Sequence, residues 1–75
     1  MLTIYTAPGC GACTVTKAAA RSAGIPYEVV DLSTNPELVD QLRARGHLAL
    51  PVVVSDDGQE WAGLDLDRIR ALATA

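Results

Sequence analysis

The sequence predicts an α/β domain in which a four-stranded mixed sheet is flanked by three helices, in the order β-α-β-α-β-β-α. Two observations predict this class. Short runs rich in β-branched residues alternate with longer runs of helical character, and glycine or proline separates most neighbouring runs. The chain has 75 residues, of which 49% are hydrophobic, so we expect residues 1–75 to form one small domain.

The first half of the chain predicts a strand, a helix and a second strand. Residues 2–6 (LTIYT) and residues 27–32 (YEVVDL) are β-branched or aromatic runs with alternating polarity. Residues 14–23 are alanine-rich and favour a helix, which Gly24 and Pro26 end. We expect one face of this helix to consist of Val15, Ala18, Ala19 and Ser22. Because a strand–helix–strand crossover joins parallel strands, the first two strands should be parallel.

The middle of the chain predicts a second helix within residues 33–46. Asn35 is expected as its N-cap and Pro36 as its first residue, and Gly46 closes it. Hydrophobic residues recur along this segment at helical spacing. The buried stripe of the helix should therefore consist of Leu38, Val39 and Leu42.

The last third of the chain predicts a hairpin followed by a helix. Residues 50–55 (LPVVVS) are nearly continuous aliphatic, as expected of a central strand. Residues 56–59 (DDGQ) are typical of a tight turn, so residues 60–62 should return as an antiparallel strand. A final helix is expected over residues 65–75, with Asp65 as its N-cap.

Charge and hydropathy exclude two classes of partner. The net charge is −3 and the pI about 4.7, whereas nucleic acids are bound through a surplus of lysine and arginine. No apolar run is long enough for a transmembrane helix, and the N-terminus MLTIYTAPGC lacks the features of a signal peptide. We therefore expect a cytoplasmic monomer that binds neither nucleic acid nor membrane.

Both cysteines of the chain, Cys10 and Cys13, lie in the segment APGCGAC between the first strand and the first helix. A structural staple over so short a ring would contribute only about 2 kcal/mol. A zinc site needs four ligands, and His47 is the only further soft ligand. A C-x-x-C pair at this point of a β-α-β unit is instead typical of a thioredoxin-like redox motif. The pair is therefore interpreted as a dithiol active site.

The two sulfurs are expected to have different roles. Cys10 comes first in the turn, where its thiolate is exposed and the helix N-terminus stabilises the anion, so it should be the nucleophile. Cys13 lies one turn further and should resolve the mixed disulfide. Gly9 and Gly11 leave the backbone around Cys10 open to a bulky substrate, although loop flexibility also explains them.

A proline interrupts the third strand. Pro51 would lose a ladder hydrogen bond inside a central strand. We therefore expect Pro51 to begin the strand after a cis bond to Leu50, and to turn backbone groups toward the thiols.

The segments YTAPGCGAC, GIPYEVVDLS, LPVVV and EWAGLDLDRI together resemble the NrdH-redoxin branch of the glutaredoxins. The resemblance implies a thioredoxin fold, a Cys10/Cys13 redox-active disulfide with no bound cofactor, and a cis-Pro51 facing it. It also implies reduction by thioredoxin reductase, with NADPH as the upstream electron source, and electron delivery to a class Ib ribonucleotide reductase. The expected partner-binding residues are Pro8, Gly9, Gly11, Ala12, Leu50, Pro51, Trp61 and Gly63.

Some residues admit two interpretations. Glutathione is the alternative reductant, and Asp65 could hold its amino group, but Ala7 stands where a basic residue usually recruits it. Trp61 could line the partner groove or lie in the core. Lys17 and Arg21 could contact an acidic partner or form a solvated face, and His47 is expected on a surface loop. A non-catalytic, zinc-holding binding module is the remaining alternative.

Overall fold

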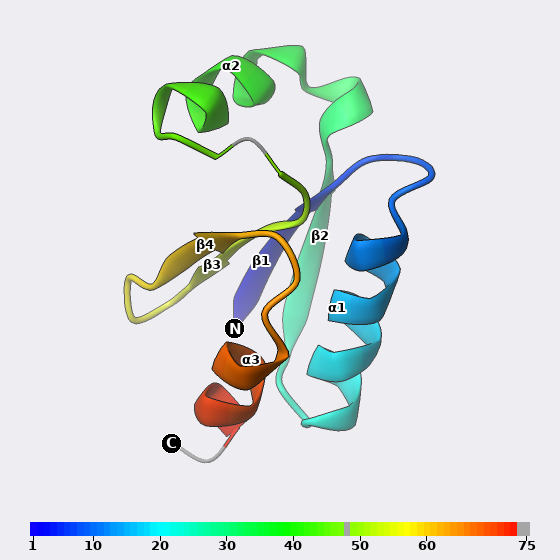
Figure 1. Ribbon diagram of the computed structural model, residues 1–75, viewed down its shortest axis with the longest axis vertical. Coiled ribbons are helices and arrows are strands. Elements are labelled where there is room, and N and C mark those ends of the chain that lie inside the picture. Colours follow the sequence, from blue (N-terminus) through cyan, green and yellow to red (C-terminus); the bar gives the residue numbers. More distant parts are fainter. Residues whose placement is uncertain (48, 74–75) are drawn as a thin grey trace.

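The computed structural model of the protein describes residues 1–47 and 49–73 (Figure 1). Its elements follow the predicted order, with one additional 3₁₀ turn, η1. They are β1 (Leu2–Thr6), α1 (Gly11–Ser22), β2 (Tyr27–Asp31), η1 (Leu32–Thr34), α2 (Pro36–Ala44), β3 (Val52–Ser55), β4 (Glu60–Ala62) and α3 (Leu66–Ala73). Among the described residues, no helix is both long and apolar enough to cross a membrane.

The four strands form one mixed sheet in the order β2-β1-β3-β4. β1 and β2 are parallel, and β3 is antiparallel to both β1 and β4, which confirms the predicted crossover and the predicted hairpin. Alternate residues of the strands contribute to two separate hydrophobic clusters. Their side chains thus point to opposite faces of the sheet, as the period of a strand requires.

The main cluster lies between the sheet and the helices α1 and α3. It consists of Leu2, Ile4, Ala20, Val53, Trp61 and Ile69. The second cluster lies on the α2 side of the sheet and consists of Leu32, Leu42 and Val52, with Leu38 and Val39 packed against it. The predicted stripe of the second helix is thereby confirmed.

The first helix differs from its prediction in both its start and its buried face. α1 begins at Gly11 rather than at residue 14, because Cys10 occupies the N-cap position and its sulfur accepts a hydrogen bond from the Cys13 N–H. The buried residues are Cys13, Thr16 and Ala20. Val15, Ala18 and Ser22 of the predicted face are exposed and Ala19 is half-buried, so the predicted face is not the buried one. In a run of alanines, small differences in side-chain size do not reveal which side faces the core.

Two capping predictions have different outcomes. Asp65 is the N-cap of α3 as predicted, since its carboxylate accepts a hydrogen bond from the Arg68 N–H at 3.1 Å. Asn35 occupies the N-cap position of α2, and Pro36 is the first helical residue as predicted. The Asn35 amide, however, donates to the Asp31 carbonyl oxygen at 2.9 Å instead of capping the helix. The tight η1 turn before α2 brings that carbonyl within reach.

The first residues of the chain lie far from the cysteine-bearing loop. β1 runs from the N-terminal end of the chain toward the loop that joins it to α1, and α3 lies at the same end of the molecule as the N-terminus (Figure 1). The Met1 ammonium group forms an exposed ion pair with Asp56.

Candidate active site

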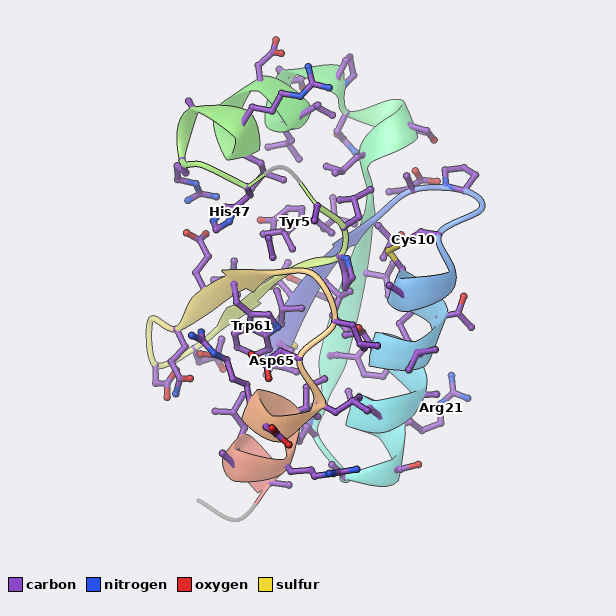
Figure 2. All side chains as sticks on the ribbon, in the orientation of Figure 1. Tyr5, Cys10, Arg21, His47, Trp61 and Asp65 are labelled. Carbon is purple, nitrogen blue, oxygen red and sulfur yellow. A yellow bond between two sulfur atoms is a disulfide. The ribbon has the colours of Figure 1, made fainter. Side chains whose placement is uncertain are left out.

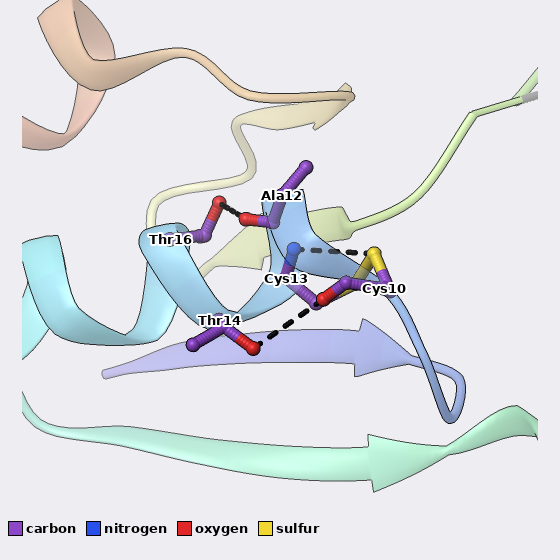
Figure 3. The surroundings of a disulfide bond; sticks show 5 residues. All are labelled: Cys10, Ala12, Cys13, Thr14 and Thr16. Carbon is purple, nitrogen blue, oxygen red and sulfur yellow. Dashed lines mark hydrogen bonds between the residues drawn. A yellow bond between two sulfur atoms is a disulfide. The ribbon is translucent and has the colours of Figure 1, made fainter.

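The two cysteines form a disulfide at the N-terminus of α1, directly after the loop that follows β1 (Figure 3). Their Cα atoms are 5.3 Å apart. The Cys13 N–H donates to the Cys10 sulfur at 3.1 Å, and the Thr14 N–H donates to the Cys10 carbonyl oxygen at 3.3 Å. The first turn of the helix thus directs an N–H group at the first sulfur, where it can stabilise a thiolate.

The two sulfurs differ in exposure. Cys13 is only 2% exposed and faces the core side of α1, whereas Cys10 is half-buried. A bulky disulfide can therefore reach Cys10 more easily than Cys13. This difference is what the predicted roles of nucleophile and resolving thiol require.

A tight turn places Cys10 at the start of the helix. The Cys10 N–H donates to the Ala7 carbonyl oxygen at 3.3 Å, and Gly9 has a φ of 78°. Proline at the second position and a glycine with positive φ at the third are the signature of a type II turn. Glycine is therefore favoured at position 9 because the turn needs a positive φ there. Gly11 has an ordinary φ and open space where a side chain would lie, so it leaves room in front of the dithiol.

A buried threonine fixes the turn that carries the cysteines. Thr16 is fully buried, and its hydroxyl donates to the Ala12 carbonyl oxygen at 2.8 Å (Figure 3). The Thr14 hydroxyl makes a longer contact, 3.4 Å, to the Cys10 carbonyl oxygen. Both bonds run from a side chain to a carbonyl oxygen four residues earlier, so they brace the first turn of α1, which carries the two sulfurs.

The Leu50–Pro51 peptide bond is cis, as predicted. β3 begins at Val52, so Pro51 directly precedes the strand rather than beginning it as the sequence predicts. The Pro51 carbonyl oxygen accepts a hydrogen bond from the Gly63 N–H at 2.8 Å. This bond joins the loops before β3 and after β4, and thereby brings together two of the predicted partner-binding residues, Pro51 and Gly63.

Trp61 lies in the main core and is 6% exposed (Figure 2). The Arg68 guanidinium lies over its ring, 5.4 Å from the centroid. Of the two interpretations of Trp61, the core position is the one that its packing supports. So little of its surface is exposed that it offers a partner almost no contact.

A pocket of about 400 Å³ lies beside the dithiol. It is lined by Thr6, Ala7, Pro8, Gly9, Cys10, Gly11, Cys13, Thr14, Lys17 and Asp31. Three predicted partner-binding residues, Pro8, Gly9 and Gly11, are thus gathered around the sulfurs.

Asp31 was not recognised as a site residue from the sequence. Its pKa is lowered because the Ser33 side chain and backbone N–H both donate hydrogen bonds to its carboxylate. The predicted parallel pairing of the first two strands was the feature that could have revealed Asp31 as a site residue. β1 and β2 are parallel, and Thr6 pairs with Asp31, so the residue that ends β2 lies beside the end of β1, from which the cysteine loop leaves.

A second groove, of about 350 Å³, lies on the α2 side of Ala7. It is lined by Ala7, Leu32, Ser33, Val39, Leu42, Arg43, His47, Ala49, Leu50 and Val52.

His47 was predicted on the surface, but its side chain is only 14% exposed. Its Nε2 lies 3.0 Å from a carboxylate oxygen of Glu60 without forming a well-angled hydrogen bond (Figure 2). Arg45 also pairs with Glu60, at 3.1 Å. No group of three or more potential metal ligands occurs among the described residues.

The dipeptide between the cysteines gives one prediction. Ala12 is the second residue of α1, where proline removes no helical hydrogen bond. We expect Ala12→Pro to stiffen the turn and to favour the disulfide, which makes the dithiol more reducing by tens of millivolts, where about 30 mV corresponds to about 1.4 kcal/mol. The reduction potential of each variant is measured by redox equilibration with a dithiol buffer, and Ala12→Ser is the control. An unchanged or more oxidising potential would contradict it.

Comparison with known proteins agrees with this geometry. The family model for glutaredoxin matches residues 2–60. The glutaredoxin-like protein NrdH of Salmonella typhimurium is 41% identical over 71 residues, which cover 95% of this chain and 86% of that protein. The structure of the glutaredoxin-like protein NrdH-redoxin from Escherichia coli is 38% identical, with a TM-score of 0.88 over 95% of this chain and 92% of that one. A thioredoxin-like protein of solved structure is 25% identical, with a TM-score of 0.81 over 96% of this chain and 99% of that one.

Proposed function

We propose, from the premise that this chain belongs to the glutaredoxin family of thiol-disulfide oxidoreductases, that it is a small dithiol electron carrier reduced by thioredoxin reductase. It passes these electrons to protein disulfides, among them those of a class Ib ribonucleotide reductase. The observation that carries the proposal is a C-x-x-C disulfide at a helix N-terminus, with one accessible and one buried sulfur.

The proposed cycle moves two electrons from the dithiol to the target. The Cys10 thiolate attacks one sulfur of the target disulfide, and the other target sulfur leaves as a thiolate and takes a proton. The Cys13 thiol then loses its proton and attacks the Cys10 sulfur of the mixed disulfide. The Cys10–Cys13 disulfide forms and the target is released as a dithiol. The reductase returns two electrons, which come from NADPH.

The partner surface of this proposal surrounds the exposed sulfur. Pro8, Gly9, Gly11 and Ala12 flank Cys10 in the chain, and the first three line the dithiol pocket. Leu50 lines the second groove, which shares Ala7 with the dithiol pocket. We include Pro51 and Gly63, which a hydrogen bond joins, and leave out Trp61 because it is buried.

Two features favour thioredoxin reductase over glutathione as the reductant. Position 7, directly before the cysteine loop, is alanine, so it supplies no positive charge for a glutathione carboxylate. The Asp65 carboxylate caps α3 and pairs with the Arg68 guanidinium at 3.3 Å, so it is already occupied by groups of the chain itself. We place the cycle in the cytoplasm, where thiols are kept reduced, and expect a monomer.

The choice of reductase tests the proposal. We expect NADPH oxidation when the protein is mixed with thioredoxin reductase and a model protein disulfide such as insulin. Glutathione with glutathione reductase should support little turnover. Cys10→Ser, which removes the nucleophile, is the control and should be inactive in both assays. Turnover that depends on glutathione alone would assign the protein to the glutathione-dependent glutaredoxins instead.

A further inference from the structure

The dithiol pocket contains two opposite charges in addition to the sulfurs. Lys17 follows Cys13 by four residues and Cys10 by seven, so α1 places all three on one side of the helix. Asp31 reaches the same pocket from the end of β2. The other residues that line the pocket are uncharged apart from the cysteines themselves.

Asp31 is a fixed negative charge. Its carboxylate accepts the Ser33 N–H at 2.8 Å, which holds the side chain in place and favours its ionised form. Asp31 is paired in register with Thr6, a buried residue of β1 that also lines the pocket. The backbone of Asp31 is thus placed by its strand pairing, and its carboxylate is held by Ser33.

Lys17 is a cation that the described structure leaves unpaired. Within residues 1–47 and 49–73, the ion pairs involve other groups, and none joins Lys17 to Asp31. Arg21, the next cation on α1, instead donates to the Tyr27 hydroxyl at 3.1 Å and does not line the pocket. Figure 2 shows Arg21 far along the helix from Cys10. Only Lys17 of the two is placed to act on a thiolate.

We propose that Lys17 and Asp31 act as positioning residues that set the thiolate population of the reduced dithiol in opposite directions. The Lys17 ammonium group stabilises the Cys10 thiolate, and the Asp31 carboxylate disfavours it, because a nearby opposite charge favours an ion and a like charge disfavours it. The proton that Cys10 loses goes to solvent in the open pocket. The inference rests on the dithiol role proposed above.

The pH dependence of alkylation tests the proposal without any reductase or target protein. The reduced protein is treated with iodoacetamide from pH 5 to 9, and the modification of Cys10 is followed by mass spectrometry. We expect Lys17→Gln to move the alkylation midpoint up by about 0.5 pH unit, and Asp31→Asn to move it down by about the same amount. Below the midpoint, the rate should fall about threefold in the first variant and rise about threefold in the second.

Matched controls distinguish an effect of the charges in the pocket from an effect of the net charge of the protein. Arg21→Gln removes one positive charge from the same helix, and Glu28→Gln removes one negative charge from β2; neither residue lines the pocket. Both controls should leave the midpoint within about 0.1 pH unit of the parent. Lys17→Arg should keep the parent value, and added salt should reduce both shifts.

Two results would overturn the proposal. One is a Lys17→Gln shift no larger than that of Arg21→Gln; the other is a shift of the same sign for Lys17→Gln and Asp31→Asn. If Asp31→Asn does not fold, the proposal is decided by comparing the alkylation midpoints of Lys17→Gln and Arg21→Gln. A protein that thioredoxin reductase fails to reduce, but whose midpoint shifts as expected, would contradict the proposed function and leave this inference intact.

Discussion

Cys13→Ser is expected to accumulate a covalent adduct with its target proteins, whereas Cys10→Ser should trap almost none. The first step of the cycle needs only the Cys10 thiolate, and the second needs the Cys13 sulfur to displace the target. Removing the second sulfur therefore stops the reaction at the mixed disulfide. The difference in exposure supports this order, because Cys13 is 2% exposed and Cys10 is half-buried.

The adducts can be counted on non-reducing gels after incubation with a lysate or with a purified ribonucleotide reductase. A reducing agent should release them. The variant that lacks both cysteines gives the background, and each single variant serves as the control for the other. Equal trapping by Cys10→Ser and Cys13→Ser would show that the roles of the two sulfurs are not separated as proposed.

Ile4→Ala should destabilise the protein by about 2–5 kcal/mol, the range for truncating a large aliphatic side chain in a core. Ile4 is 0% exposed and lies in the main cluster together with Val53, its register partner on β3. A domain of this size has a free energy of unfolding of only about 4–11 kcal/mol. The substitution thus removes a large part of the stability.

Val29→Ala is the matched control, because Val29 pairs with Ile4 across the sheet but is 45% exposed. We expect it to change the free energy of unfolding by no more than about 0.5 kcal/mol. Urea titration followed by circular dichroism measures both variants. Similar losses of unfolding free energy in the two variants would mean that Ile4 is not packed in the main cluster as described.

The order of the elements could be predicted because each boundary carries its own chemical signal. Pro51 interrupts an aliphatic run, and its cis bond to Leu50 is as predicted, although β3 begins one residue later than expected, at Val52. Asp65 is a standard capping residue and caps α3. The parallel pairing of β1 and β2 follows from a general rule of chain handedness.

The start and the buried face of α1 could not be predicted in the same way. Gly11 and Ala12 carry no pattern, and a cysteine sulfur is not among the usual capping groups. The helix starts at Gly11 because the Cys10 sulfur accepts the Cys13 N–H, an interaction that only the folded turn reveals.

The charges in the dithiol pocket depend on contacts between distant parts of the chain. Asp31 lies far from the cysteines in sequence and reaches the pocket only because β2 pairs with β1 in one particular register. A shift of one residue would turn its side chain to the other face of the sheet. The residue pattern of one segment taken alone does not fix that register, because the partner strand also sets it.

The direction of β1 has a practical consequence for how the domain can be attached to other molecules. The N-terminal end and α3 lie at the end of the sheet away from the cysteine loop (Figure 1). A linker, an affinity handle or a solid support joined to the N-terminus therefore leaves the sulfur-bearing face clear. Such an attachment removes the charge of the Met1 ammonium group and so breaks its exposed ion pair with Asp56, a kind of contact that contributes about 0–1 kcal/mol. The domain is thus suited to immobilisation with its reactive end facing the solution.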